Sequence, residues 1–155
     1  VEFTPKADFE LQTPLVGDSE MQHLDYAHAS GMLEDFVAEG RLYLTIRGRK
    51  YTPGFEFRVG GNRITTKGVQ TEVDAGYEGE DVVVLIEGKN TKMQDTIIRQ
   101  LYYPFRKWDI QTTKRVIPMF FEKRGDDYMF WMYEFTDPSD YNSIRLVRSR
   151  RYRPF

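Results

Sequence analysis

The sequence contains no cysteine, and histidine occurs only twice. A disulfide framework, a thiolate zinc site and a cysteine nucleophile are therefore excluded. The longest uncharged apolar run, Val82 to Ile86, is far shorter than the roughly 18 residues that a membrane-spanning helix needs. No basic and then apolar leader opens the chain. We therefore expect a cytoplasmic protein without a membrane partner.

The chain has enough residues, 155, for one domain with a single core. Apolar residues make up 40% of it and aromatic residues 15%, which is too much bulky apolar surface for a disordered chain. We predict one folded domain over residues 1–155. Since the chain begins at Val1, we also expect that it could be excised from a longer protein.

The net charge of −2 conceals an uneven distribution along the chain. Residues 1–39 carry nine acids against one base, and residues 41–67 carry seven bases against one acid. Residues 141–155 add five arginines and no acid. Such basic segments either follow a phosphate backbone or are ordinary solvated strand edges and tails, and charge alone favours neither interpretation.

The hydrophobic periodicity predicts an α/β (α+β) domain, in which helices flank one central mixed sheet. Residues 1–18 are predicted to be an irregular lead-in, and residues 141–155 a basic C-terminal tail. A capping box from Ser19 to Gln22 predicts a helix over residues 19–38. Strands are predicted at residues 41–47, 55–59, 71–74, 81–89, 115–122 and 128–135, and the first two are predicted to form a hairpin. A second helix is predicted at residues 95–103, and Pro104 should kink or end it.

Charged residues follow the most apolar of these strands. Val82 to Ile86 is apolar on both faces, which is typical of a strand in the middle of a sheet. Glu87 and Lys89 come next, one position apart and therefore on one face. A buried charge needs a partner, so a metal ion or a polyanionic substrate would explain them. Asp74 ends the preceding short strand, and a hairpin would bring it beside Glu87.

Asp74, Glu87 and the carbonyl of Gly88 would form the open, oxygen-rich site that Mg²⁺ prefers. Lys89 could orient or deprotonate an attacking water and stabilise charge on phosphorus. The alternative is a surface ion pair worth well under about 1 kcal/mol, because Glu-x-Lys is common by chance.

The segment from Thr71 to Lys89 resembles the PD-(D/E)XK nuclease superfamily, and the resemblance extends over residues 19–135. Asp74 matches the motif aspartate, Glu87 the acidic residue and Lys89 the lysine. The run Arg99-Gln100-Leu101-Tyr102-Tyr103 is similar to the helix that follows the motif in poorly characterised type II restriction enzymes. The sequence departs from the family at Val73, where proline is common, and in the spacing of its Gln and Tyr.

The resemblance implies a restriction-endonuclease-like core of helix, three-stranded meander, helix and strand. It also implies a Mg²⁺-dependent deoxyribonuclease, with Mn²⁺ as the alternative ion, that cuts double-stranded DNA and leaves 5′-phosphate ends. Asp74, Glu87 and Gly88 would hold the metal, and Lys89 would assist the water. Because both strands of a duplex are cut, the resemblance further implies a homodimer.

Members of the superfamily often take a further acid from the first helix. Glu34 is the first candidate here, because it lies in a stripe of small residues, and Glu20 and Asp25 are weaker candidates; Glu72 is the other acid that could complete the site. Gln100 would be a catalytic residue that positions the strand. The candidate DNA-binding residues are Arg47, Arg49, Arg58, Arg99, Arg148, Arg150 and Arg151.

Other functions remain open at this stage. The same core supports nucleases of repair, recombination or mobile-element processing, and it also supports nucleic-acid-binding modules that lack catalysis. A glycosidase with paired carboxylates is disfavoured by the lysine beside Glu87 and by the basic segments.

Overall fold

The computed structural model describes the backbone of the chain except at residues 18, 53–55, 66–68, 89–93 and 155, and it describes the side chains of that part except at residues 15, 49–52, 69–72 and 94–100. The elements in chain order are β1 (Glu2–Phe3), the short 3₁₀ helix η1 (Thr13–Leu15), α1 (Glu20–Ala29), α2 (Met32–Val37), β2 (Tyr43–Thr52), β3 (Glu56–Val59), β4 (Asn62–Thr65), β5 (Val69–Glu78), β6 (Val82–Gly88), α3 (Gln94–Gln111), β7 (Arg115–Arg124), β8 (Asp127–Phe135) and β9 (Ile144–Pro154).

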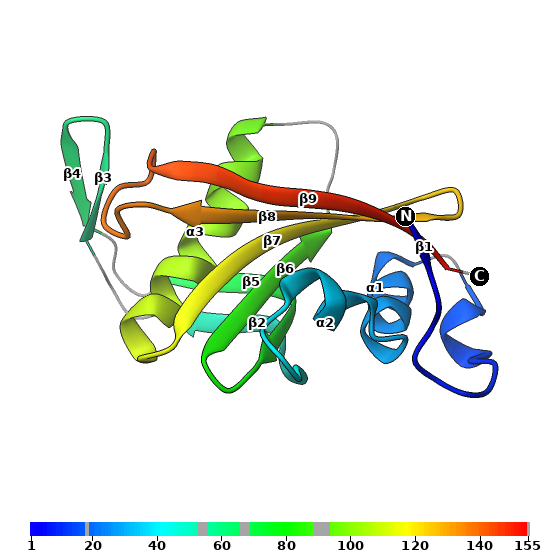
Figure 1. The fold of residues 1–155 in the computed structure, drawn as a ribbon. Helices are drawn as coiled ribbons and strands as arrows, with labels where there is room; N and C mark the ends of the chain where they lie inside the picture. Colours follow the sequence, from blue (N-terminus) through cyan, green and yellow to red (C-terminus); the bar gives the residue numbers. More distant parts are fainter. Residues whose placement is uncertain (18, 53–55, 66–68, 89–93, 155) are drawn as a thin grey trace.

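Seven strands form one mixed sheet in the order β1-β9-β8-β7-β6-β5-β2, and β3 and β4 form a separate two-stranded hairpin. Within the large sheet β6 and β7 run parallel, as do β1 and β9, and the other neighbours are antiparallel. In Figure 1, α1 and α2 lie on one face of this sheet and α3 on the other. The predicted α+β class, with a central mixed sheet and flanking helices, is confirmed.

The apolar strand β6 lies in the middle of the sheet because both of its faces are covered. Val84 and Ile86 belong to the core that includes the apolar residues of α1 and α2. Val83 and Leu85 belong to the second core, which includes the buried residues of α3. The alternation along a strand thus sends successive side chains into two different cores.

The first helical segment is two helices, so the prediction of one helix over residues 19–38 is wrong. The capping box at Ser19 does start α1, since the Ser19 Oγ accepts the Gln22 N–H at 3.1 Å. The chain then turns at Gly31, whose φ of 89° lies in the left-handed region that favours glycine. Helix α2 therefore points in a new direction and has its own apolar face.

Helix α3 continues through Pro104, where the sequence predicted a kink or an end. Proline removes one helical N–H donor, but buried residues on both sides of it, Leu101 and Phe105, pack against the sheet and hold the helix together. Packing therefore outweighs the local preference. None of the described helices is long and apolar enough to cross a membrane.

The basic tail predicted for residues 141–155 is instead β9, which pairs with β8 from Phe135↔Ile144 to Tyr128↔Tyr152. Tyr152 is buried, and its ring packs edge-on against Phe130 at 5.9 Å. The lead-in contributes β1, which pairs with the end of β9. The predicted hairpin of residues 41–47 with 55–59 is also wrong, because β2 pairs with β5 and β3 pairs with β4.

Candidate functional site

The candidate site lies at the carboxyl end of β6. Strands β6 and β7 are parallel neighbours joined through α3, and Glu87 and Gly88 pair with Phe120 and Phe121 at this end. In α/β sheets, ligands bind outside the carboxyl ends of parallel strands, where loops and helix ends supply functional groups. The predicted acids are therefore at the end of the sheet where a site is expected.

Asp74 reaches this end from β5, because β5 and β6 form the predicted hairpin. Ala75 pairs with Ile86, so Asp74 and Glu87 occupy the next position on their two strands. The Asp74 Oδ2 accepts a hydrogen bond from the Gly88 N–H at 2.7 Å. The structure thus brings Asp74 to the strand end that carries Glu87 and Gly88.

Glu20, the first residue of α1, lies beside the same glycine. A Cβ atom built on Gly88 would be 2.7 Å from the Glu20 Cγ and 3.2 Å from the Asp74 Oδ2. Both distances are shorter than an ordinary contact, so the two acidic side chains fill the space that a side chain at position 88 would need. Only glycine leaves room for them.

Burial raises the pKa of Glu20, and the nearby carboxylates of Glu122 and Asp74 raise it further. A hydrogen bond from the Lys123 backbone N–H and the charge of His23 act in the opposite direction. Loss of hydration is the largest of these effects, so the pKa of Glu20 stays above its ordinary value. A cation would favour the ionised form of Glu20.

Glu87 is 8% exposed, and alternation along β6 puts it on the same face as Val83 and Leu85, the face that α3 covers. Glu122 follows the apolar run of β7 as Glu87 follows that of β6. Its side chain is 12% exposed, and its Oε2 accepts from Arg124 at 2.7 Å. Sequence reasoning missed Glu122, although an acid directly after a buried strand was the signal that identified Glu87.

Glu34, the first candidate for a further acid, has a different role. Its Oε2 accepts the Leu42 N–H at 2.7 Å and its Oε1 lies 3.5 Å from the Lys6 Nζ. These contacts of Glu34 connect α2 to the N-terminal segment and to the segment before β2. Asp25 pairs with Arg47 at 2.8 Å. The acid that the structure brings to Asp74 is Glu20, which sequence reasoning had ranked lower.

Several predicted residues cannot be placed in this way. Lys89 lies outside the described residues. Arg99 and Gln100 belong to α3, and Arg49 and Glu72 to β2 and β5, but their side chains are outside the described part. Their roles remain predictions from the resemblance.

The donors at this end suit a hard divalent cation, because Asp74, Glu20 and Glu87 supply carboxylate oxygens and Gly88 a carbonyl. Asp74 and Glu20 share the space next to Gly88. Within the described part of the chain, however, no three His, Asp or Glu side chains converge closely enough to hold a metal ion. The oxygen donors at the strand end are thus of the type that Mg²⁺ or Mn²⁺ takes, but the described side chains do not meet at one point.

The predicted DNA-binding arginines that the structure describes all have partners within the domain. Arg47 pairs with Asp25 as above, and Arg58 forms an ion pair with Asp137. The three arginines of β9 contact groups on α2 and at the start of β8: Arg148 donates to the Phe36 and Val37 carbonyls at 2.7 and 2.8 Å, Arg150 lies 3.5 Å from Asp35, and Arg151 lies 3.7 Å from Asp127. Each of these arginines therefore has an acidic or carbonyl partner within the domain.

The structure shows an α+β fold with acidic residues at the carboxyl end of the central strand β6. Residues 3–153 match the model of a domain family of unknown function, DUF6997, and the chain belongs to this family. No curated protein and no solved structure shows significant similarity to the chain.

Proposed function

We propose that this domain is a divalent-metal-dependent deoxyribonuclease. One observation supports the proposal: the Asp74 carboxylate accepts a hydrogen bond from the Gly88 N–H and lies next to Glu20. Both lie at the end of the strand that carries Glu87. The order of α1, the meander β2-β5-β6, α3 and β7 agrees with the helix, three-stranded meander, helix and strand of the PD-(D/E)XK core. This agreement in chain order supports the resemblance of the motif.

In the proposed site Asp74, Glu87 and the Gly88 carbonyl hold Mg²⁺ or Mn²⁺, and Glu20 takes the place expected for Glu34. The bound ion would neutralise charge on the phosphate and lower the pKa of water. Asp74 is kept in position by its hydrogen bond from the Gly88 N–H. Glu20 would accept a proton readily because burial raises its pKa, so it suits a role in moving protons at the reacting water.

Lys89 has its proposed role from the resemblance alone, and substitution tests it directly. If Lys89 orients the attacking water, Lys89→Arg should lower the single-turnover cleavage rate about a hundredfold, or about 2.7 kcal/mol, because a guanidinium is wider and does not lose its proton. If Lys89 only pairs with a carboxylate, arginine should replace it within a few-fold.

Double-stranded DNA is the proposed substrate, cleaved to leave 5′-phosphate ends, and a homodimer would cut both strands. A restriction role and a role in repair, recombination or mobile-element processing use the same chemistry. They differ in DNA recognition, which the acids at the strand end do not determine.

The test is incubation of supercoiled plasmid with the protein in Mg²⁺, in Mn²⁺ and in EDTA. We expect metal-dependent nicking that Asp74→Asn and Glu87→Gln each reduce at least about a hundredfold. Glu134→Gln is the matched control, since Glu134 lies in an exposed ion pair with Arg145. Cleavage that persists in EDTA or in Asp74→Asn would refute the proposal, and DNA binding without any nicking would favour a non-catalytic module.

Metal binding can be measured without activity. At a free ion concentration ten times the Kd, Mn²⁺ should stabilise the parent by about 1.4 kcal/mol, and this gain should be absent in Asp74→Asn. A thermal melt with and without Mn²⁺ makes the comparison. Equal stabilisation of the parent and Asp74→Asn would place the ion elsewhere.

A further inference from the structure

The β3–β4 hairpin stands apart from the large sheet, at the end of the molecule opposite the two termini (Figure 1). Its buried residue, Phe57, packs on Tyr102 and Tyr103 of α3 at 5.2 and 5.6 Å. The Arg58 N–H and carbonyl bond the backbone of Ser139 and Tyr141, both at 2.6 Å. Strand β3 is therefore firmly anchored, whereas all four residues of β4 are exposed.

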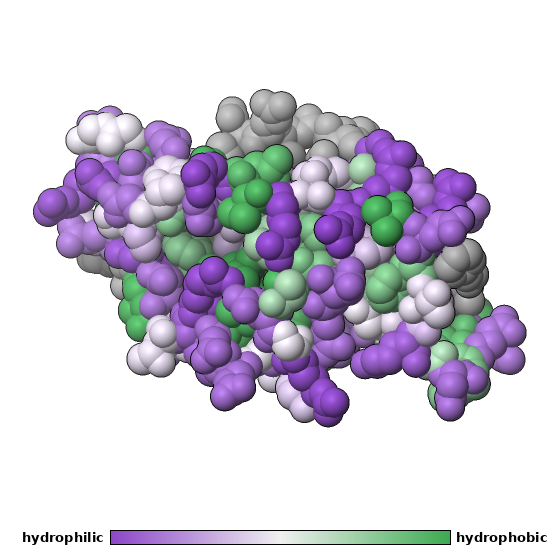
Figure 2. Space-filling view, in the orientation of Figure 1, coloured by the Kyte–Doolittle hydropathy of each residue, from purple (hydrophilic) through white to green (hydrophobic). Residues whose placement is uncertain are grey.

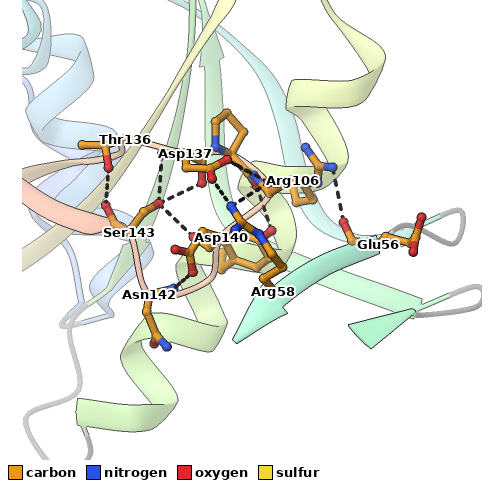
Figure 3. Close-up of polar contacts among 11 residues, drawn as sticks. Glu56, Arg58, Arg106, Thr136, Asp137, Asp140, Asn142 and Ser143 are labelled. Carbon is orange, nitrogen blue, oxygen red and sulfur yellow. Dashed lines mark hydrogen bonds and ion pairs between the residues drawn. The ribbon is translucent and has the colours of Figure 1, made fainter. Parts of the chain in front are cut away.

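A pocket of about 230 Å³ lies between this hairpin, α3 and the loop before β9. It is lined by Glu56, Phe57, Arg58, Arg63, Arg106 and Ser139. Three arginines thus reach one pocket from three elements, β3, β4 and α3. Figure 2 shows mainly hydrophilic surface over this end of the molecule, and Figure 3 shows Arg58 directed to Asp137 and Arg106 directed to the Glu56 backbone.

Arg58 and Arg63 are direct partners in the hairpin register, so their side chains leave the same face as neighbours. Like charges in this arrangement are unfavourable unless something neutralises them. Asp137 pairs with Arg58. Among the described residues, the charged partner of Arg63 is Glu56, with the Arg63 Nε 3.8 Å from the Glu56 Oε1, and the Arg63 side chain is 75% exposed. Its charge is the less well balanced of the two.

Arg106 is also incompletely paired, although its side chain is only 18% exposed. It donates to the Glu56 carbonyl at 3.3 Å, and its Nη1 lies 3.8 Å from the Asp109 Oδ2. Its Nε is buried and has no hydrogen-bond partner among the described residues. A guanidinium has five N–H donors, and burying one of them unpaired costs free energy that an acceptor oxygen would recover.

We propose that this pocket binds a phosphate group, namely a phosphodiester of the DNA. The identity of the DNA rests on the proposed function; the phosphate chemistry rests on the pocket itself. A phosphate matches the planar, forked donors of Arg63 and Arg106. Glu56 also lines the pocket, but an incoming phosphate replaces its loose contact with Arg63.

The test uses the cleavage-inactive Asp74→Asn chain, a fluorescent duplex and a series of NaCl concentrations without divalent metal. Each lost phosphate contact should lower the slope of log K against log salt by about 0.9. We therefore expect Arg63→Gln and Arg106→Gln each to lower the slope by about one and to raise the Kd several-fold at 150 mM salt. Arg63→Gln changes an exposed residue, so it remains informative if Arg106→Gln does not fold.

Arg115→Gln is the matched control, because Arg115 forms an exposed ion pair with Glu39 at 2.6 Å. A salt slope equal to the parent's in both Arg63→Gln and Arg106→Gln would overturn the pocket while leaving the nuclease proposal intact. A second arm measures the melting temperature with inorganic phosphate. Stabilisation of the parent but not of Arg63→Gln, with no DNA binding at all, would keep the phosphate pocket and reject DNA as its source.

Discussion

Replacing Gly88 by alanine would test whether the acids at the end of β6 act together. The new Cβ would start 2.7 Å from the Glu20 Cγ, and an ordinary contact begins at 3.4 Å, so Glu20 must move by about 0.7 Å. The Asp74 Oδ2, at 3.2 Å from the new atom, must also give by a few tenths of an ångström. One methyl group thus displaces two proposed site residues without removing either.

Misplacement by about 1 Å in an active site costs about a hundredfold in rate, so we expect Gly88→Ala to lose between about tenfold and a hundredfold in cleavage. Two opposing effects determine the change in the free energy of unfolding. Gly88 is not among the residues with a positive φ, so alanine adopts its backbone conformation and gains about 0.4–1 kcal/mol from reduced chain entropy. Overpacking costs about 1–3 kcal/mol. The net loss should not exceed about 2.5 kcal/mol.

The measurement that does not depend on activity is the NMR titration of the Glu20 carboxyl. Burial raises the pKa of Glu20, so displacement toward water in Gly88→Ala should lower that pKa toward its ordinary value. Gly61→Ala is the control, because a Cβ there has nothing within 4 Å. If Gly88→Ala leaves both the titration and the cleavage rate as in the parent, the space next to Gly88 is free and our description of the site is wrong.

Three further substitutions test the electrostatics and the packing. The pKa of Glu20 is raised in the folded state, so ionisation of Glu20 destabilises the fold as pH rises above about 4.5. Glu20→Gln should therefore have a higher melting temperature than the parent at pH 7 and the same melting temperature near pH 3.5. Identical melting curves of the two proteins at both pH values would contradict this. Arg148→Ala should lower the free energy of unfolding in urea by about 1.5–3 kcal/mol, because two carbonyls at the end of α2 lose a charged donor. Arg145→Ala is the control and should be nearly neutral, because Arg145 lies in an exposed ion pair. Tyr77→Phe should leave stability unchanged or raise it, because the buried Tyr77 hydroxyl has no hydrogen-bond partner in the described part. Tyr102→Phe should lose about 1 kcal/mol, because it removes the hydrogen bond from the Tyr102 hydroxyl to the Pro138 carbonyl. Equal losses in the two variants would contradict this.

The sequence was informative where burial and periodicity agree. Val82 to Ile86 is apolar on both faces and is the central strand, because only a strand covered on both sides tolerates that pattern. The capping box at Ser19 was equally reliable, since it depends on local hydrogen bonds. The approach of Asp74 to Gly88 followed from a hairpin between adjacent strands, which is the simplest connection.

The sequence misled where long side chains hide a strand or where one residue redirects the chain. In β9 the arginines extend over the surface, so the strand has few buried side chains. Its sequence therefore resembles that of a charged tail. Gly31 ends the first helical segment early, and this moves Glu34 away from the face that carries Glu20. The pairing of β9 with β8 depends on contacts between separate segments, and the turn at Gly31 depends on one backbone conformation, so neither changes the hydrophobic period.

The charge asymmetry along the chain largely disappears on folding. Asp35, in the acidic first segment, accepts a hydrogen bond from the Tyr152 hydroxyl at 2.7 Å and lies 3.5 Å from Arg150. The acidic N-terminal segment and the basic C-terminal segment therefore contact each other here. This balance is incomplete at the two proposed sites. Glu20 and Asp74 receive hydrogen bonds from backbone N–H groups but pair with no cation among the ion pairs of the described residues, and Arg63 and Arg106 lie 3.8 Å from their acidic partners. A cation at the first place and a phosphate at the second would restore the balance, and a nucleic acid with its metal ion supplies both.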